Sequence, residues 1–184
     1  MDAGRLRRAG ALGAVLALGA TGLVASGATA DSNDRAAKER ATITMAVDGK
    51  DFVFEGPRSV ESGAKLEIVN DTKPKKVGPH TFSLVKKGAL PETKADAKKC
   101  EQFKGVCGKV AQAHEVNPET FEIGAPDVDV AKKGWDASFG KEGDTWYTET
   151  EGEDTVRKVS AEPGSKLYYL CVVHPFMQGK IKVK

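Results

Sequence analysis

Residues 168–183, near the C-terminal end of the chain, have the sequence YYLCVVHPFMQGKIKV. A cysteine, a histidine and a methionine stand three residues apart in this segment, at Cys171, His174 and Met177. Thiolate, imidazole and thioether groups are ligands that copper prefers in proteins. Apolar residues alternate with other residues before and after this turn, which predicts two strands joined by a ligand-bearing loop. The alternating residues are Leu167, Tyr169, Ile181 and Val183.

A fourth candidate ligand lies far upstream, in the segment 79–85, PHTFSLV. His80, Phe82 and Leu84 share one face of the strand that this segment predicts, and the intervening hydroxyl residues share the other. The imidazole therefore begins the face that carries the apolar side chains. Two histidines, one cysteine and a weak axial methionine form the ligand set of a mononuclear blue-copper site, which serves electron transfer.

Each of these residues has a simpler explanation when taken alone. His80 would then be a structural strand histidine, and Met177 would fill the core. A Cys-x-x-His pair is also half of a zinc site, or a nucleophile with its base. The thioether has no role in nucleophilic chemistry and is rarely a zinc ligand, so the combination favours copper.

The closing loop, CVVHPFMQGK, resembles the ligand loop of the cupredoxins, most closely the amicyanin, pseudoazurin and plastocyanin branch. The resemblance covers roughly residues 42–85 and 155–184. It implies an all-β, antiparallel Greek-key β-sandwich with one type 1 copper ion and no enzymatic activity. It also implies that the ring edge of the second histidine reaches the surface among apolar neighbours. The implied metal ligands are His80, Cys171, His174 and Met177.

Two positions depart from the pattern of that family. Thr81 stands where many members have an asparagine that ties the two ligand loops together, and Val172 stands where serine or threonine is common. We therefore expect that the usual tie cannot be made in the same way. Contacts of this kind orient metal ligands and tune the reduction potential.

The resemblance favours an electron carrier that meets a redox protein transiently and acts as a monomer. An alternative is a copper-binding module that holds or delivers copper without electron transfer. A third hypothesis is an accessory domain that docks on a larger oxidase or reductase. Nothing in the composition indicates a nucleic-acid partner.

Residues 1–30 indicate an export signal. Arginines precede an apolar run of alanine, glycine, leucine and valine, and Ala28-Thr29-Ala30 has the form of a cleavage site. A retained membrane anchor is the alternative. Removal of the signal takes away three of the 28 basic and one of the 26 acidic residues, which leaves no formal net charge and no membrane span. The predicted location is periplasmic, cell-envelope or extracellular.

Residues 31–40 are polar and predict a flexible linker. Residues 41–184 then form one cupredoxin-like domain, in which short alternating segments predict strands of a sandwich. An insertion spans about 86–145, with a short helix expected near 92–102 and a long loop over 111–143. We expect His114 to be an exposed loop histidine. Four aromatic residues are expected to bury the insertion against the sheet: Trp135, Phe139, Trp146 and Tyr147.

The chain contains three cysteines, so one is left over after a single pairing. Pairing Cys100 with Cys107 closes a short loop and leaves Cys171 free to bind a metal. The alternative is that Cys171 itself pairs with one of the other two, which would leave the nearby histidines and methionine without a purpose.

Overall fold

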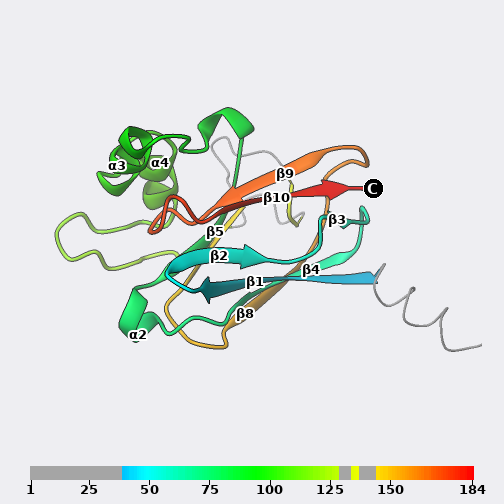
Figure 1. The fold of residues 1–184 in the computed structure, drawn as a ribbon, viewed down its shortest axis with the longest axis horizontal. Helices are drawn as coiled ribbons and strands as arrows, with labels where there is room; N and C mark the ends of the chain where they lie inside the picture. The colour runs from blue at the N-terminus through cyan, green and yellow to red at the C-terminus, as the bar shows by residue number, and fades with distance from the viewer. Residues whose placement is uncertain (1–38, 129–133, 137–143) are drawn as a thin grey trace, which may run out of the picture.

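A computed structural model describes residues 39–128, 134–136 and 144–184 of the chain (Figure 1). The predicted export signal, nearly all of the predicted linker, and Phe139 lie outside the described residues. Among the described helices, none is both long and apolar enough to cross a membrane.

The described strands form two sheets, as Figure 1 shows. The first sheet has the order β2-β1-β4-β8, and the second has the order β3-β10-β9-β5-β7-β6. In the first sheet the bounds are β1 (Arg40–Asp48), β2 (Asp51–Glu55), β4 (Lys65–Asn70) and β8 (Asp154–Lys158). In the second they are β3 (Ser59–Val60), β5 (His80–Val85), β6 (Asp127–Val128), β7 (Thr145–Thr148), β9 (Lys166–Leu170) and β10 (Gln178–Val183).

The predicted β-sandwich is confirmed, and its sheets are mixed rather than purely antiparallel. β1 pairs with β4 in parallel, and β10 pairs with β3 in parallel. The parallel pair in the first sheet has a topological reason. The chain leaves that sheet after β2, adds β3 to the second sheet, and returns as β4 alongside β1.

Side chains from both sheets fill a common core, and the alternation predicted for β9 and β10 is confirmed. Phe82 lies at the centre, with its ring centroid 5.1 Å from that of Trp135 and 4.8 Å from that of Tyr169. The fully or almost fully buried aliphatic members include Ile43, Met45, Leu66, Ile68, Leu84, Leu167, Ile181 and Val183.

The insertion contains two helices, α3 (Lys94–Glu101) and α4 (Gly105–Ala113), joined by the Cys100–Cys107 disulfide. The helix expected near 92–102 is present, whereas α4 extends into a region expected to be a loop. The reason is that Val106 and Val110 are one helical turn apart, and one side of α4 is buried. A second small core lies beneath the helices: Val85, Cys100, Cys107, Val110, Leu170 and Val172.

Four features gather at the end of the sandwich opposite the C-terminus (Figure 1). They are α2 (Pro74–Val77), α3, α4, and the turn between β9 and β10. The short 3-10 helix Lys87–Ala89 links β5 to this group. This end therefore holds both segments that carry the predicted metal ligands.

Removal of the disulfide should lower stability without removing the metal site. We expect the double variant Cys100→Ala/Cys107→Ala to lose about 2–3 kcal/mol of unfolding free energy, because the short closed loop no longer restricts the unfolded chain. Denaturant unfolding of reduced and oxidised wild type provides the matched comparison. Equal stability of all three forms would show that the bridge does not stabilise the fold.

Candidate metal centre

His80 is placed by the start of β5. Gly78, with a φ of 86°, ends α2 and donates its N–H to the carbonyl of Pro74, and β5 begins two residues later. The His80 side chain is fully buried, and its Nδ1 lies 3.8 Å from Sγ of Cys171. Its Nε2 has no hydrogen-bond partner in the described part of the chain. The side chain is thus oriented by packing, with Nδ1 toward the sulfur.

The turn between β9 and β10 positions the other candidate ligands. The N–H of Cys171 donates to the carbonyl of Met177 at 2.9 Å, and the N–H of Met177 donates to the carbonyl of His174 at 2.8 Å. The Gln178 side chain donates to the carbonyls of Pro175 and Pro91, at 2.7 and 2.8 Å. These bonds close the turn and attach it to the insertion.

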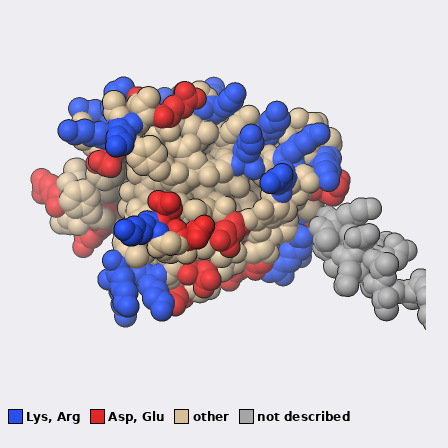
Figure 2. All heavy atoms as spheres, in the orientation of Figure 1, with Lys and Arg blue, Asp and Glu red and all other residues tan. Residues whose placement is uncertain are grey.

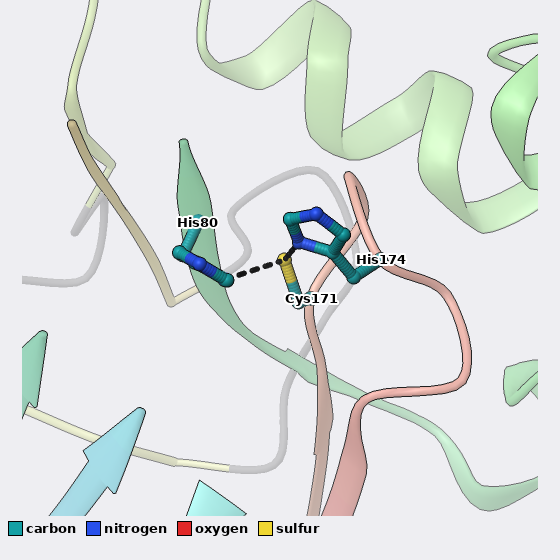
Figure 3. A group of neighbouring side chains, drawn as sticks. All are labelled: His80, Cys171 and His174. Atoms are coloured by element: carbon teal, nitrogen blue, oxygen red, sulfur yellow. Dashed lines mark hydrogen bonds between the residues drawn. The ribbon is translucent and has the colours of Figure 1, made fainter. Parts of the chain in front are cut away.

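Three donor atoms converge between β5 and this turn (Figure 3). Nδ1 of His174 lies 3.7 Å from Sγ of Cys171, and one ligand atom from each of His80, Cys171 and His174 lies within 4.8 Å of the other two. In metal sites, nitrogen and sulfur ligand atoms lie about 2.0 and 2.3 Å from the ion. A nitrogen and a sulfur that bind one ion at an angle of about 120° would therefore be separated by about the sulfur-to-nitrogen distances seen here. The three side chains are therefore placed to bind one metal ion.

Met177 lies in the same turn, and its side chain is 1% exposed. It packs in the main core together with Cys171. The structure thus keeps the Met177 side chain away from water, in the same turn as Cys171 and His174. Its role as a weak axial ligand stays a prediction.

The tie between the two ligand segments is made by Thr81. Its N–H donates to Sγ of Cys171 at 3.3 Å, and its hydroxyl oxygen accepts the N–H of Val172 at 3.0 Å. The sequence indicated that the family's usual side-chain tie could not form here. In the structure a bond from a main-chain N–H to the Thr81 side chain ties the segments instead. The sequence does not predict this bond, because almost every residue has a main-chain N–H and the sequence does not show which one lies near Thr81.

A second unpredicted neighbour is Phe52, which reaches the site from β2 in the first sheet. Its ring centroid lies 4.0 Å from that of His174 and 5.6 Å from that of His80. The two imidazole centroids are 4.6 Å apart. Phe52 therefore restricts the rotation of both rings. Phe52 alternates with Phe54 along β2, a pattern that indicates a strand but not a contact with the ligands.

The ring edge of His174, which we expected to reach the surface, is partly exposed and partly covered by α2. His174 is half-buried, and its Nε2 lies 3.1 Å from the carbonyl of Val77 in α2. The ring does line a surface hollow with Phe52 and Phe176. Phe176 is 62% exposed and Val173 is 40% exposed, so exposed apolar side chains lie beside the ring as expected. Charged residues line the same hollow: Lys50, Asp51 and Glu101.

Burial sets the protonation of the three donors when no metal is bound. It lowers the pKa of His80 to about 4, with a further contribution from His174, and it lowers the pKa of His174. Burial also raises the pKa of the Cys171 thiol, against the hydrogen bonds from Thr81. At neutral pH both imidazoles are neutral, so metal binding displaces a proton only from the thiol.

The metal-free protein should lose stability on acidification. The folded-state pKa of His80, about 4, lies below the ordinary value of 6.5. Between these values the unfolded chain binds more protons, so the unfolding free energy falls as the pH falls. Urea unfolding at several pH values measures this slope. His80→Phe should flatten it, and an unchanged slope would show that His80 is not the source.

His114 is not the exposed loop histidine that the sequence indicated. It follows α4 and is 1% exposed, and its ring contacts the carbonyl of Ala125 and the hydroxyl of Thr145 in β7. Burial lowers the pKa of His114. It is not part of the donor cluster formed by His80, Cys171 and His174.

Comparison with solved structures finds cupredoxins. Reduced auracyanin from Roseiflexus castenholzii matches with a TM-score of 0.41 and 14% identity, over 80% of this chain and 98% of that chain. A reduced amicyanin variant matches at 0.39 and 15%, over 80% and 85%. Rusticyanin from Thiobacillus ferrooxidans matches at 0.35 and 18%, over 79% and 76%.

No protein-family model and no curated protein matches this chain. The likeness to these solved structures lies in the two-sheet arrangement. The chemistry below therefore follows from the side chains.

Proposed function

We propose that this protein carries single electrons by means of one type 1 copper ion. His80, Cys171 and His174 would hold the ion, and Met177 would be a further, weak ligand. The observation that supports this proposal is the convergence of a thiol and two imidazole nitrogens in a buried position, at 3.7 and 3.8 Å from sulfur to nitrogen. Cysteine, two histidines and methionine are the donors of a blue-copper site.

Copper held by such ligands supplies reversible one-electron chemistry between Cu(I) and Cu(II). The chain's contribution is to keep the donors in place. The turn is closed by the hydrogen bonds of Met177, and Phe52 packs against both imidazoles. Thr81 donates its N–H to the sulfur. Donors that are already in position need little movement when the oxidation state changes.

The proposed partner is a redox protein that binds briefly. The apolar side chains of Val173 and Phe176 lie exposed beside His174, and transient redox encounters use small interfaces. Figure 2 shows both basic and acidic side chains on the displayed face, with basic groups at the upper right and lower left and acidic side chains between and beside them. This face does not provide a field of one sign that would select a strongly charged partner.

We further propose that residues 1–30 direct export and are removed, and that 31–40 link the signal to a monomeric domain at 41–184. The mature protein then works in the periplasm, at the cell envelope or outside the cell, without enzymatic activity. The Cys100–Cys107 disulfide supports an oxidising compartment. Mass spectrometry of the secreted protein should find its first residue at Asp31, and an intact N-terminus would contradict cleavage.

The test of function compares electron exchange with copper transfer. The copper-loaded protein should exchange electrons rapidly and reversibly with a small one-electron reagent at a fixed potential, and should retain its copper meanwhile. Loss of copper to an acceptor protein without reversible exchange would instead support copper holding or delivery. Stable association with a larger oxidase or reductase would support the accessory-domain hypothesis.

Replacement of the axial thioether should change the potential and preserve the colour. In Met177→Leu the other three donors remain, so the thiolate-to-copper band should persist. The reduction potential should rise, because removal of a donor destabilises bound Cu(II) more than it destabilises bound Cu(I). Voltammetry and absorption spectroscopy measure the two effects. An unchanged potential would exclude Met177 as a ligand.

A further inference from the structure

The insertion contributes a buried imidazole close to the candidate metal centre. His114 is 1% exposed, and its Nδ1 lies 2.6 Å from the carbonyl oxygen of Ala125. Its Nε2 lies 3.0 Å from the hydroxyl oxygen of Thr145 in β7. Both ring nitrogens are therefore engaged, and the ring is fixed against β7 rather than available to solvent.

A chain of three buried hydroxyl groups begins at Thr145. Its Oγ1 lies 2.5 Å from Oγ of Ser83, and Ser83 Oγ lies 3.1 Å from Oγ1 of Thr81. Thr81, Ser83 and Thr145 are each at most 1% exposed. Thr81 and Ser83 occupy the face of β5 opposite Phe82. This hydroxyl-bearing face is therefore buried and not exposed to solvent.

The chain ends at the sulfur ligand. Thr81 accepts the N–H of Val172 with its hydroxyl oxygen and donates its own N–H to Sγ of Cys171. A continuous series of hydrogen bonds thus runs from His114 to the residue after the cysteine, and its last member also contacts the sulfur. The series joins the insertion to both ligand segments.

Burial of three hydroxyl groups lowers the stability of the fold unless each group is hydrogen-bonded. Apolar residues would cover the sheet at lower cost, as they do in the second core beneath α3 and α4. In a water-excluded environment, hydrogen bonds in series polarise one another. Hydrogen bonding around a cysteine ligand is one of the features that set the potential of a blue-copper site.

We propose that His114 is a positioning residue that acts through Thr145, Ser83 and Thr81 to fix the hydrogen bonding around Cys171. This inference rests on the proposed copper site. It assigns the insertion a part in setting the reduction potential. When the chain is broken, the Thr81 hydroxyl is no longer held by Ser83, so the bonds from the Val172 N–H to this hydroxyl and from the Thr81 N–H to the sulfur are held less firmly. More negative charge then stays on the sulfur, and the potential falls.

The sharpest variant is Thr145→Val, which keeps the side-chain shape and removes the link between Ser83 and His114. Ser83→Ala breaks the next link and serves if the first variant does not fold. His114→Leu removes the imidazole, and His114→Gln retains a hydrogen-bonding group. Thr42→Val is the matched control, because it removes a hydroxyl bond to Glu67 in the first sheet.

Two readouts test the proposal. In metal-free protein, nuclear magnetic resonance should show the Thr81 and Val172 amide protons shifted in Thr145→Val and in Ser83→Ala, but not in Thr42→Val. In copper-loaded protein, both variants and His114→Leu should lower the potential and move the charge-transfer band. His114→Gln should restore part of the change.

Unshifted amides together with an unchanged potential in folded Thr145→Val or Ser83→Ala would overturn the proposal. Failure of the wild type to form the charge-transfer band would overturn the proposed function instead. In that case the amide measurement alone decides the hydrogen-bond chain: shifts confined to the chain variants support it, and their absence refutes it.

Discussion

Cys171→Ser should abolish the intense thiolate-to-copper absorption band of the Cu(II)-loaded protein. Cys171 is the one free cysteine of the chain, and its buried Sγ lies between the Nδ1 atoms of His80 and His174. A serine hydroxyl cannot supply sulfur-to-copper charge transfer and is a poor ligand for a soft ion. Copper affinity should also fall by more than about 100-fold, beyond the usual effect of losing a supporting contact.

Absorption spectroscopy and a competitive copper titration measure both effects. The matched control is Cys100→Ala/Cys107→Ala, which removes two sulfur atoms outside the cluster and should keep the band. A coloured Cys171→Ser protein would exclude this residue as the ligand. Loss of colour in the double variant alone would show that the insertion cysteines hold the copper.

Phe82→Ala should be the most destabilising single substitution among those considered. The ring is fully buried, and it contacts the rings of Phe54, Trp135 and Tyr169 at centroid distances of 4.8 to 5.8 Å. Truncation of a buried phenylalanine leaves a cavity and costs about 3–5 kcal/mol. Because His80 lies two residues away on the same strand, weaker metal binding should accompany the loss.

Chemical denaturation of the metal-free protein measures the loss of unfolding free energy. Phe176→Ala is the control, because it removes the same ring from a side chain that is 62% exposed. Its effect should be within about 0.5 kcal/mol. Similar losses in the two variants would contradict the core position of Phe82.

Much of the site could be predicted because its chemistry depends on residue type. The spacing of Cys171, His174 and Met177 indicated a ligand loop. The position of His80 at the start of an apolar strand face indicated that it is a further ligand. The odd number of cysteines indicated the Cys100–Cys107 pair, which the structure contains. The alternation of apolar and other residues was sufficient to predict the strands that line the core.

Other features depend on which surfaces the insertion covers, and local patterns do not contain that information. His114 and the hydroxyl face of β5 have the composition of exposed segments, but they are buried together. The contact of Phe52 with His174 joins different sheets. The hydroxyl of Thr81 replaces a family-typical side-chain tie by bonding to the main chain.

X-ray absorption at the copper edge of the loaded wild-type protein tests the central proposal most directly. We predict one short sulfur ligand and two nitrogen ligands, with the sulfur lost in Cys171→Ser and one nitrogen lost in His80→Gln. A copper ion surrounded only by nitrogen and oxygen, or a site unaffected by His80→Gln, would contradict it.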